Sequence, residues 1–246
     1  MDNIPEDHPR YKSLVTREKI VEGFNRGLVA PQGLIAHGRG EAFDYILGEK
    51  SHGFTLKAEK AAVQLLINSD HPVISVNGNT AALVPEELVK LSELLDAPLE
   101  VNLFHWSQER AQKIADFLQS YGANVLSAGD AVLEGLKSDR RMVDSRGIYR
   151  ADTVLVPLED GDRCEILKKH GKKAIAIDLN PLSRTSQMAD ITIVDNVTRA
   201  IPNMIEILES LKPSETTRSY SEFDNEQNLG EAVEVICSYL NCKVSK

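Results

Sequence analysis

The sequence has 246 residues, of which 42% are hydrophobic and 26% charged, so the chain can bury a full core in a single domain over 1–246. Its formal net charge of −9 argues against a nucleic-acid-binding surface, because such surfaces carry an excess of Lys and Arg that neutralises phosphates. Cys164, Cys237 and Cys242 follow no metal-ligand spacing and no segment reaches the roughly 18 apolar residues that span a bilayer, which predicts a reduced, cytoplasmic protein that contacts no membrane.

Residues 1–70 are predicted to be mainly helical, because their apolar residues recur at helical spacing. One helix is expected over about 11–28 and another over about 55–68. Between them lies the segment 33–49, GLIAHGRGEAFDYILGE, in which apolar residues flank a cluster of titratable groups and glycines. Such a segment must lie near the core and still keep a cation accessible, which predicts one wall of a pocket.

The first expected helix carries a cation on its apolar side. At about 100° per residue, Arg17 falls inside a stripe about 80° wide that we expect to face the core. The other members of this stripe are Leu14, Val21, Phe24 and Leu28. A buried guanidinium without an anion is unfavourable, so a negative group should meet it. Two interpretations stay open: a structural salt bridge or a solvated head on a buried stem, and an anionic ligand.

The HGRG motif supplies a second cation. If a helix begins near Gly40, then Arg39 and the N–H groups of Gly40 and Glu41 lie at its N-terminus, an arrangement that holds phosphate. Glycines at 38 and 40 would let the backbone approach a ligand closely. The alternative is a tight turn with a solvated Arg39. The expected inward face of this helix is Ala42, Phe43, Ile46 and Leu47.

From residue 71 to 211, short apolar runs alternate with helical patterns. This alternation is typical of a mostly parallel sheet covered on both faces, so we predict an α/β fold of the doubly wound type. The strands are expected within 72–78, 98–104, 123–128, 152–157, 172–180 and 189–196, and the helices over 85–95, 107–122, 162–171 and up to about 211.

Two less regular regions interrupt or follow this core. Segment 130–150 is charged and only partly periodic, so no firm element is predicted in its second half. Segment 212–227 has the composition of a polar linker. Apolar residues then recur at helical spacing over 229–240, which predicts a C-terminal helix docked on its own chain or on another subunit.

Polar residues follow the last two expected strands. Residues 178–180 and 195–196 should lie at the carboxyl ends of neighbouring strands, where open α/β sheets bind ligands. Arg184 lies in the connection between these strands. Asp178 or Asp195 is suited to receive ribose hydroxyls or an exocyclic amine. The same residues are also ordinary turn formers, and that alternative stays open.

A third candidate, SVNGN at 75–79, is a possible anion cradle between a strand and a helix, but it lacks the dinucleotide glycine pattern. The absence of this glycine pattern argues against a nicotinamide-dependent dehydrogenase. The histidines show no metal-ligand spacing, and no nucleophile motif is found. We therefore predict no protein-held metal site and no covalent catalysis.

Segments 4–23 (IPEDHPRYKSLVTREKIVEG), 33–49 and 177–204 (IDLNPLSRTSQMADITIVDNVTRAIPNM) together resemble the archaeal phosphopantothenate synthetase family, the 4-phosphopantoate:β-alanine ligases of coenzyme A biosynthesis. The resemblance implies a Rossmann-like homodimer that condenses 4-phosphopantoate with β-alanine. It further implies that ATP is cleaved to AMP and diphosphate through an acyl-adenylate, with Mg²⁺ bound to the nucleotide.

The resemblance also implies which residues act. ATP would be held by Arg17, Arg39, Asp178, Leu179, Asn180, Arg184, Thr185, Asn196 and Val197. Catalysis would involve His37, Arg39 and Glu41, with His37 as the best-placed base for the β-alanine ammonium, followed by Glu41 or Asp44. The alternative from another class is a regulatory protein that binds ATP or AMP without turnover.

Overall fold

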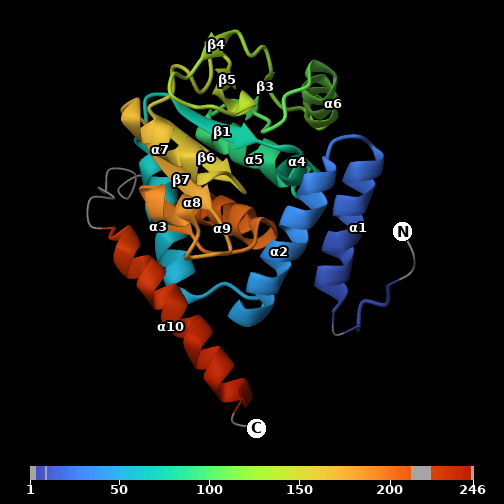
Figure 1. The fold of residues 1–246 in the computed structure, drawn as a ribbon, viewed down its shortest axis with the longest axis vertical. Helices are drawn as coiled ribbons and strands as arrows, with labels where there is room; N and C mark the ends of the chain where they lie inside the picture. The colour runs from blue at the N-terminus through green and yellow to red at the C-terminus, as the bar shows by residue number, and fades with distance from the viewer. Residues whose placement is uncertain (1–3, 9, 212–222, 245–246) are drawn as a thin grey trace.

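Within the described residues, six strands form one sheet in the order β3-β2-β1-β6-β7-β8, and every neighbouring pair is parallel. The computed structural model describes residues 4–8, 10–211 and 223–244 (Figure 1). The predicted α/β fold, with an N-terminal helical part and a C-terminal helix, is confirmed. The sheet strands are β1 (Pro72–Val76), β2 (Leu99–Val101), β3 (Val125–Leu126), β6 (Thr153–Pro157), β7 (Lys173–Ile177) and β8 (Ile191–Ile193).

Helices connect these strands and extend the fold at both ends. They are α1 (Tyr11–Asn25), α2 (Pro31–Leu47), α3 (Gly53–Ile67), α4 (Gly78–Leu83), α5 (Pro85–Leu95), α6 (Gln108–Gln119), α7 (Gly161–Lys169), α8 (Arg184–Met188), α9 (Val197–Ser210) and α10 (Asn225–Val244). No helix in the described ranges is both long enough and apolar enough to cross a membrane.

The strand order fixes where a ligand can bind. Strands β1 to β3 extend in one direction from the centre of the sheet, and β6 to β8 extend in the other. The connections that leave the adjacent carboxyl ends of β1 and β6 therefore run in opposite directions along the sheet, and a crevice opens between them. In open parallel sheets this switch point is where ligands bind.

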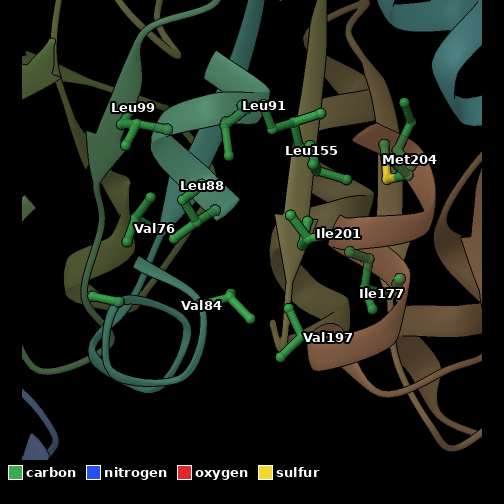
Figure 2. Packing of buried hydrophobic residues seen from close by; sticks show 14 of the residues in the cluster. Val76, Val84, Leu88, Leu91, Leu99, Leu155, Ile177, Val197, Ile201 and Met204 are labelled. Atoms are coloured by element: carbon green, nitrogen blue, oxygen red, sulfur yellow. The ribbon is translucent and has the colours of Figure 1, made fainter. Parts of the chain in front are cut away.

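Alternating strand residues build two cores. Ile74, Leu155 and Ile175 face a cluster that includes residues of α3, α5, α6 and α9. Their neighbours, such as Val73 and Val154, face a second cluster made with α7 and residues 133–151. Figure 2 shows the first of these, where side chains of α5 and α9 gather beside those of the strands.

The face of α1 that packs inward differs from the prediction. Helices α1 and α2 run side by side (Figure 1), and α1 also packs on α4. Its buried residues are Ile20 and Gly23, whereas Val21 and Phe24 are 45% and 38% exposed. A Cβ on Gly23 would lie 2.6 Å from the Cβ of Ala82, so the close approach to α4 occurs at this glycine. The predicted stripe is wrong at Val21 and Phe24, whereas Leu28, just beyond the helix, is buried as predicted.

Helix α2 begins nine residues earlier than predicted. Pro31 occupies its first turn, a position where the missing N–H is harmless, and Gly48 ends it at a φ of 85°. The HGRG motif therefore lies in the middle of the helix. The backbone N–H groups of Gly40 and Glu41 point along the helix axis into intrahelical bonding, so the predicted phosphate cradle at a helix start is wrong.

The inward face of α2 also needs correction. Leu47 is buried as predicted, but Ala42 is exposed, and Asp44 is buried in its place. Leu47 joins a third cluster in which Leu229 and Ala232 of α10 pack against Phe54 and Leu179. The C-terminal helix is thus docked on its own chain.

The irregular regions are also partly organised. Segment 130–150 contains a small antiparallel pair, β4 (Ala131–Val132) and β5 (Met142–Val143), and a 3₁₀ turn at Asp139–Arg141. Buried Glu100 on β2 holds this segment by accepting from the backbone N–H groups of Asp144 at 3.0 Å and Ile148 at 2.5 Å. The expected linker mostly lies outside the described residues, and its last part, 225–227, belongs to α10.

Candidate active site

A cavity of about 570 Å³ opens at the switch point, bounded by α2, by the carboxyl ends of the strands and by the start of α6. The predicted site residues that line it are His37, Arg39, Glu41, Asp178, Leu179, Asn180, Thr185, Asn196 and Val197. Arg17 and Arg184 do not line it. The cavity thus joins the HGRG motif to strand ends some 140 residues further along the chain (178 − 39 = 139).

One face of α2 forms a wall of this cavity. Gly33, Ala36, His37 and Gly40 all line it, and their spacing of three and four residues places them along a single helix face. The methyl of Leu179 would lie 3.6 Å from a Cβ on Gly40, so the wall passes close to the turn after β7. The motif therefore reaches the cavity through a helix face.

Arg39 is a cation on this wall without an acidic ion-pair partner among the described residues. Its side chain is exposed and forms no ion pair or hydrogen bond with any residue in the described ranges. Burial raises the pKa of Asp178 and the positive charge of Arg39 opposes that rise, so the two cavity-lining groups lie near enough for their charges to interact. Arg39 is consequently available to an anion.

His37 lines the same cavity and carries an unsatisfied ring nitrogen. Its Nε2 atom is buried and has no hydrogen-bond partner among the described residues. Burial lowers the pKa of His37, and the nearby Arg17 guanidinium adds to this, while Glu41 and Asp44 oppose it. The imidazole is therefore neutral at pH 7 and can accept a proton or a hydrogen bond.

Arg17 is occupied by Glu41. The guanidinium Nε donates to both carboxylate oxygens of Glu41, at 2.8 and 2.9 Å, and the Nη2 atom lies 2.8 Å from Oε1. The Arg17 side chain is 42% exposed, so it was not drawn into the core. Of the two interpretations left open by the sequence, the structure contains the salt bridge.

The turn after β7 is tightly hydrogen-bonded. Asp178 accepts from the backbone N–H of Asn180 at 2.9 Å and from the Ser183 hydroxyl at 2.5 Å. Burial raises the pKa of Asp178, although these two donors and Arg39 oppose the rise. Thr185 donates its hydroxyl to the backbone oxygen of Glu159 at 2.8 Å, which ties this turn to the end of β6.

Arg184 lies outside the cavity. Its guanidinium pairs with Asp162 and Glu165 on α7, and its side chain is 57% exposed. Gly161 permits this packing, because a Cβ there would lie 2.6 Å from the Cγ of Arg184. Arg184 thus connects the start of α8 to α7 through these ion pairs.

The turn after β8 is joined to α2. Asn196 caps α9 by accepting from the Thr198 N–H at 3.1 Å, and its amide donates to Asp44 at 2.8 Å. Asp44 also accepts from Arg199, which in turn contacts Asp195. Asp44 does not line the cavity and is held by two donors, so the expectation that it could serve as a base is not supported.

Asn77 and Gly78 are functional candidates that the sequence identified only as a possible anion cradle. The Asn77 amide donates to the backbone oxygens of Pro157 at 3.0 Å and Leu158 at 3.2 Å, which bridges the ends of β1 and β6. Its oxygen caps α4. A Cβ on Gly78 would lie 2.1 Å from the backbone oxygen of Leu28, so only glycine fits there.

Sequence reasoning missed a cluster of charged residues beside the switch point, formed by Arg140, Glu159, Asp160 and Arg163. Arg140 donates to Glu159 at 2.5 Å, to Asp160 at 2.9 Å and to the backbone oxygen of Asn102 at 2.9 Å. Arg163, which is completely buried, contacts the other oxygen of Glu159 at 3.3 Å. Arg140 comes from the irregular segment 130–150, where no periodicity indicated whether its side chain would be buried or exposed. The pairing of Glu159 with Arg163 at helical spacing was the one available signal.

No group of three or more His, Cys, Asp or Glu side chains in the described part of the chain is arranged to hold a metal ion. A magnesium ion carried by a nucleotide needs only phosphate oxygens, water and one or two carboxylates. Asp160 and Asp178 on the cavity lining are compatible with that second kind of site.

Comparison with known proteins shows close relatives. Residues 54–239 match the family model of phosphopantothenate/pantothenate synthetase. The chain is 51% identical over 245 residues to a 4-phosphopantoate–beta-alanine ligase of Methanosarcina mazei, covering 98% of this chain and 96% of the relative. It is 49% identical to the corresponding ligase of Thermococcus kodakarensis, over 95% of this chain and 92% of the relative.

Proposed function

The chain belongs to the phosphopantothenate/pantothenate synthetase family, and we propose that it is the ATP-dependent ligase that condenses 4-phosphopantoate with β-alanine in coenzyme A biosynthesis. The observation that carries the proposal is the cavity at the switch point, where Arg39 and His37 of α2 face Asp178 and Asn196 at the strand ends. Identity near 50% over almost the whole chain to proteins named as this ligase supports it.

We assign the nucleotide to the half of the cavity formed by β7, β8 and α2. The carboxyl ends of these strands carry Asp178, Asn180 and Asn196, whose polar side chains suit the ribose and base. Arg39, without an acidic partner among the described residues, suits the phosphates. Leu179 and Val197 provide apolar surface beside them.

The reaction we propose has two displacements. The carboxylate of 4-phosphopantoate attacks the α-phosphorus of ATP, and diphosphate leaves. The neutral amine of β-alanine then attacks the acyl carbon of the adenylate and forms the C–N bond. The bond between the acyl carbon and the AMP oxygen breaks, and AMP leaves with its electron pair. Both steps bring anions or leaving anions together, so cations and orientation supply most of the catalysis.

His37 is the group we assign to the amine proton. β-alanine enters as an ammonium and must lose one proton before it attacks. His37 is neutral because burial lowers its pKa, and its Nε2 atom has no partner in the described residues. Glu41 is the weaker candidate, because its carboxylate is held by Arg17. We assign Glu41 to positioning Arg17 beside His37.

Mg²⁺ fits this scheme as an ion that arrives with ATP. Asp178 and Asp160 are the acidic lining groups that would contact it, and it would reduce the repulsion between the phosphates and the attacking carboxylate. This chain contributes the orientation of both substrates.

We further propose a homodimer in a reducing, cytoplasmic setting. All three cysteines are free, which supports that setting. Val21, Ile35 and Tyr45 on α1 and α2 are large apolar side chains that are 45%, 75% and 61% exposed. An exposed apolar surface of this kind supports self-association, which sedimentation equilibrium tests directly.

The function is tested by following AMP and diphosphate. AMP should form only when ATP, 4-phosphopantoate and β-alanine are all present. Exchange of labelled diphosphate into ATP should require 4-phosphopantoate but not β-alanine, because the adenylate forms first. Release of ADP and phosphate would overturn the adenylate, and ATP binding without turnover would favour the non-catalytic, nucleotide-sensing alternative.

A further inference from the structure

A second pair of cations lines the cavity away from Arg39. Arg110 lies in the first turn of α6, which follows β2, and Arg140 comes from the 3₁₀ turn at Asp139–Arg141. Burial lowers the pKa of Arg110, and the charge of Arg140 lowers it further. Both residues line the cavity, and their guanidiniums are near enough for the like charges to repel.

Neither guanidinium is fully satisfied. Arg110 donates from Nη2 to the backbone oxygen of His105 at 3.1 Å, but its Nε atom is buried without a partner among the described residues. Arg140 is only 6% exposed and uses Nε and Nη1, whereas its Nη2 atom has no hydrogen-bond partner in the described ranges. A buried donor such as Nε of Arg110 is unfavourable unless something accepts from it.

Among the described residues, Arg110 is the member of the local charge cluster without a carboxylate partner. Arg140 and Arg163 meet the carboxylates of Glu159 and Asp160, and buried Glu100 also acts on Arg163. An anion in the cavity, which Arg110 lines, would supply the missing partner.

The site is also rigidly built. Arg140 is fixed by Glu159, Asp160 and the backbone oxygen of Asn102. Glu159 is fixed in turn by the fully buried Arg163. A guanidinium held in this way loses little entropy when it binds an anion, and its planar donors suit phosphate oxygens.

We propose that Arg110 and Arg140 form a subsite for the phosphate monoester of the acyl substrate. This rests on the proposed ligase function. The pair lies by β2 and α6, whereas Arg39 and Asp178 lie by α2 and β7, so the two anionic substrates bind in different halves of the cavity. The apolar side chains of Leu83, Leu103 and Phe104 line the cavity and suit the dimethyl carbon of pantoate.

This arrangement explains how the enzyme separates the phosphate from the reacting carboxylate. With the monoester held at Arg110 and Arg140, the carboxylate end of the substrate points toward the strand ends assigned to the nucleotide. Arg110 and Arg140 are thereby specificity-determining residues, because pantoate without a phosphate cannot use them.

The test uses Arg110→Gln, because Arg140 pairs with Glu159 and Asp160 and its replacement would also disturb the structure. Calorimetric titrations would measure 4-phosphopantoate, pantoate and ATP separately, with the first two in the presence of α,β-methylene ATP. Arg110→Gln should weaken 4-phosphopantoate binding by about 10- to 100-fold, because a charge-assisted bond to a dianion is lost. Binding of pantoate and of ATP should change by less than about twofold.

Two further variants keep the test decisive. Lys113→Gln removes a positive charge one turn later on α6, from a side chain that pairs with Glu109 and does not line the cavity, and it should bind all three ligands normally. Arg110→Lys retains the charge but loses the planar fork, and it should fall between the wild type and Arg110→Gln. Thermal melting reports whether any variant has lost its fold.

Each outcome separates this subsite from the ligase proposal. Unchanged 4-phosphopantoate binding in folded Arg110→Gln, or a loss of ATP binding instead, would overturn the subsite and leave the ligase function standing. Arg110-dependent binding of 4-phosphopantoate in a protein that never releases AMP would uphold the subsite and overturn the ligase. Failure of the wild type to bind 4-phosphopantoate would overturn both.

Discussion

Arg17 and Glu41, 24 residues apart, form a two-pronged ion pair in which Nε of the arginine reaches both carboxylate oxygens, at 2.8 and 2.9 Å. Glu41 lines the cavity and Arg17 does not. A carboxylate facing a site for phosphates would repel them, and Arg17 neutralises it. We therefore propose that Arg17 acts in anion binding through Glu41, without direct contact with ATP.

The pair is tested by removing its members singly and together. Arg17→Ala should raise the KM for ATP by about 10-fold, because Glu41 is left as a bare charge beside the phosphates. The Arg17→Ala/Glu41→Gln double variant should recover most of that loss, since its wall is again neutral. A double variant as impaired as Arg17→Ala would mean that the guanidinium contacts ATP itself.

Arg39 and Arg184 should respond differently to truncation. Arg39 has no partner in the described residues, so Arg39→Ala should lower kcat/KM by about 100-fold or more and leave the melting temperature unchanged. Arg184 pairs with Asp162 and Glu165 outside the cavity, so Arg184→Ala should reduce ATP affinity less. Steady-state kinetics and thermal melting measure both, and an equal loss of ATP affinity in the two variants would contradict this assignment.

His37 is tested by separating the two chemical steps. His37→Gln should retain ATP–diphosphate exchange but slow β-alanine-dependent AMP release by about 100-fold or more, because only the second step needs the proton removed. Since burial lowers the pKa of His37, the acid limb of wild-type kcat should lie below 6.5 and vanish in the variant. Equal slowing of both steps would show that His37 binds a substrate rather than acting as a base.

Two glycines near the cavity should tolerate alanine unequally. Gly78→Ala places a Cβ 2.1 Å from the backbone oxygen of Leu28, so we expect a loss of about 2 kcal/mol in the free energy of unfolding, together with reduced activity. Gly38 is exposed inside α2, and a Cβ there meets nothing within 4 Å. Gly38→Ala should stabilise the protein by about 1 kcal/mol with normal turnover. Urea denaturation at equilibrium compares the two.

Glu59 should make stability depend on pH. It is fully buried, accepts from the Asn203 amide at 3.0 Å, and burial raises its pKa to about 8 from 4.5. The folded state then holds a proton that the unfolded state has lost, so the contribution is complete below pH 4.5 and disappears as pH rises through 8.

Glu59→Gln removes this titration while keeping a group that can accept from Asn203. The free energy of unfolding of the wild type should therefore fall more steeply between pH 5 and pH 8 than that of the variant. Glu100, whose pKa burial raises to about 7, contributes a second fall that both proteins share. Glu93→Gln, at an exposed position of α5, should follow the wild type. Parallel profiles for wild type and Glu59→Gln would contradict the assignment.

The sequence anticipated the strand-end half of the candidate site better than the helical half. Asp178 and Asn196 follow buried apolar runs, and the carboxyl ends of parallel strands meet at one edge of a sheet, so their proximity follows from the pattern alone. Arg110 and Arg140 were missed. The first lies in an ordinary amphipathic helix, and the second lies in a segment without periodicity.

The sequence by itself determined the α/β class, the alternation of strands and helices, and the edge where polar residues collect, because these depend on local periodicity. Only the tertiary structure decided that α2 passes through the HGRG motif, which face of α1 is buried, and which charges pair. Glycine weakens a helix by about 1 kcal/mol, and packing against α1, α4 and α10 outweighs that local preference. Ion pairs such as Arg17–Glu41 and Arg140–Glu159 depend on distances in space, which spacing along the chain does not set.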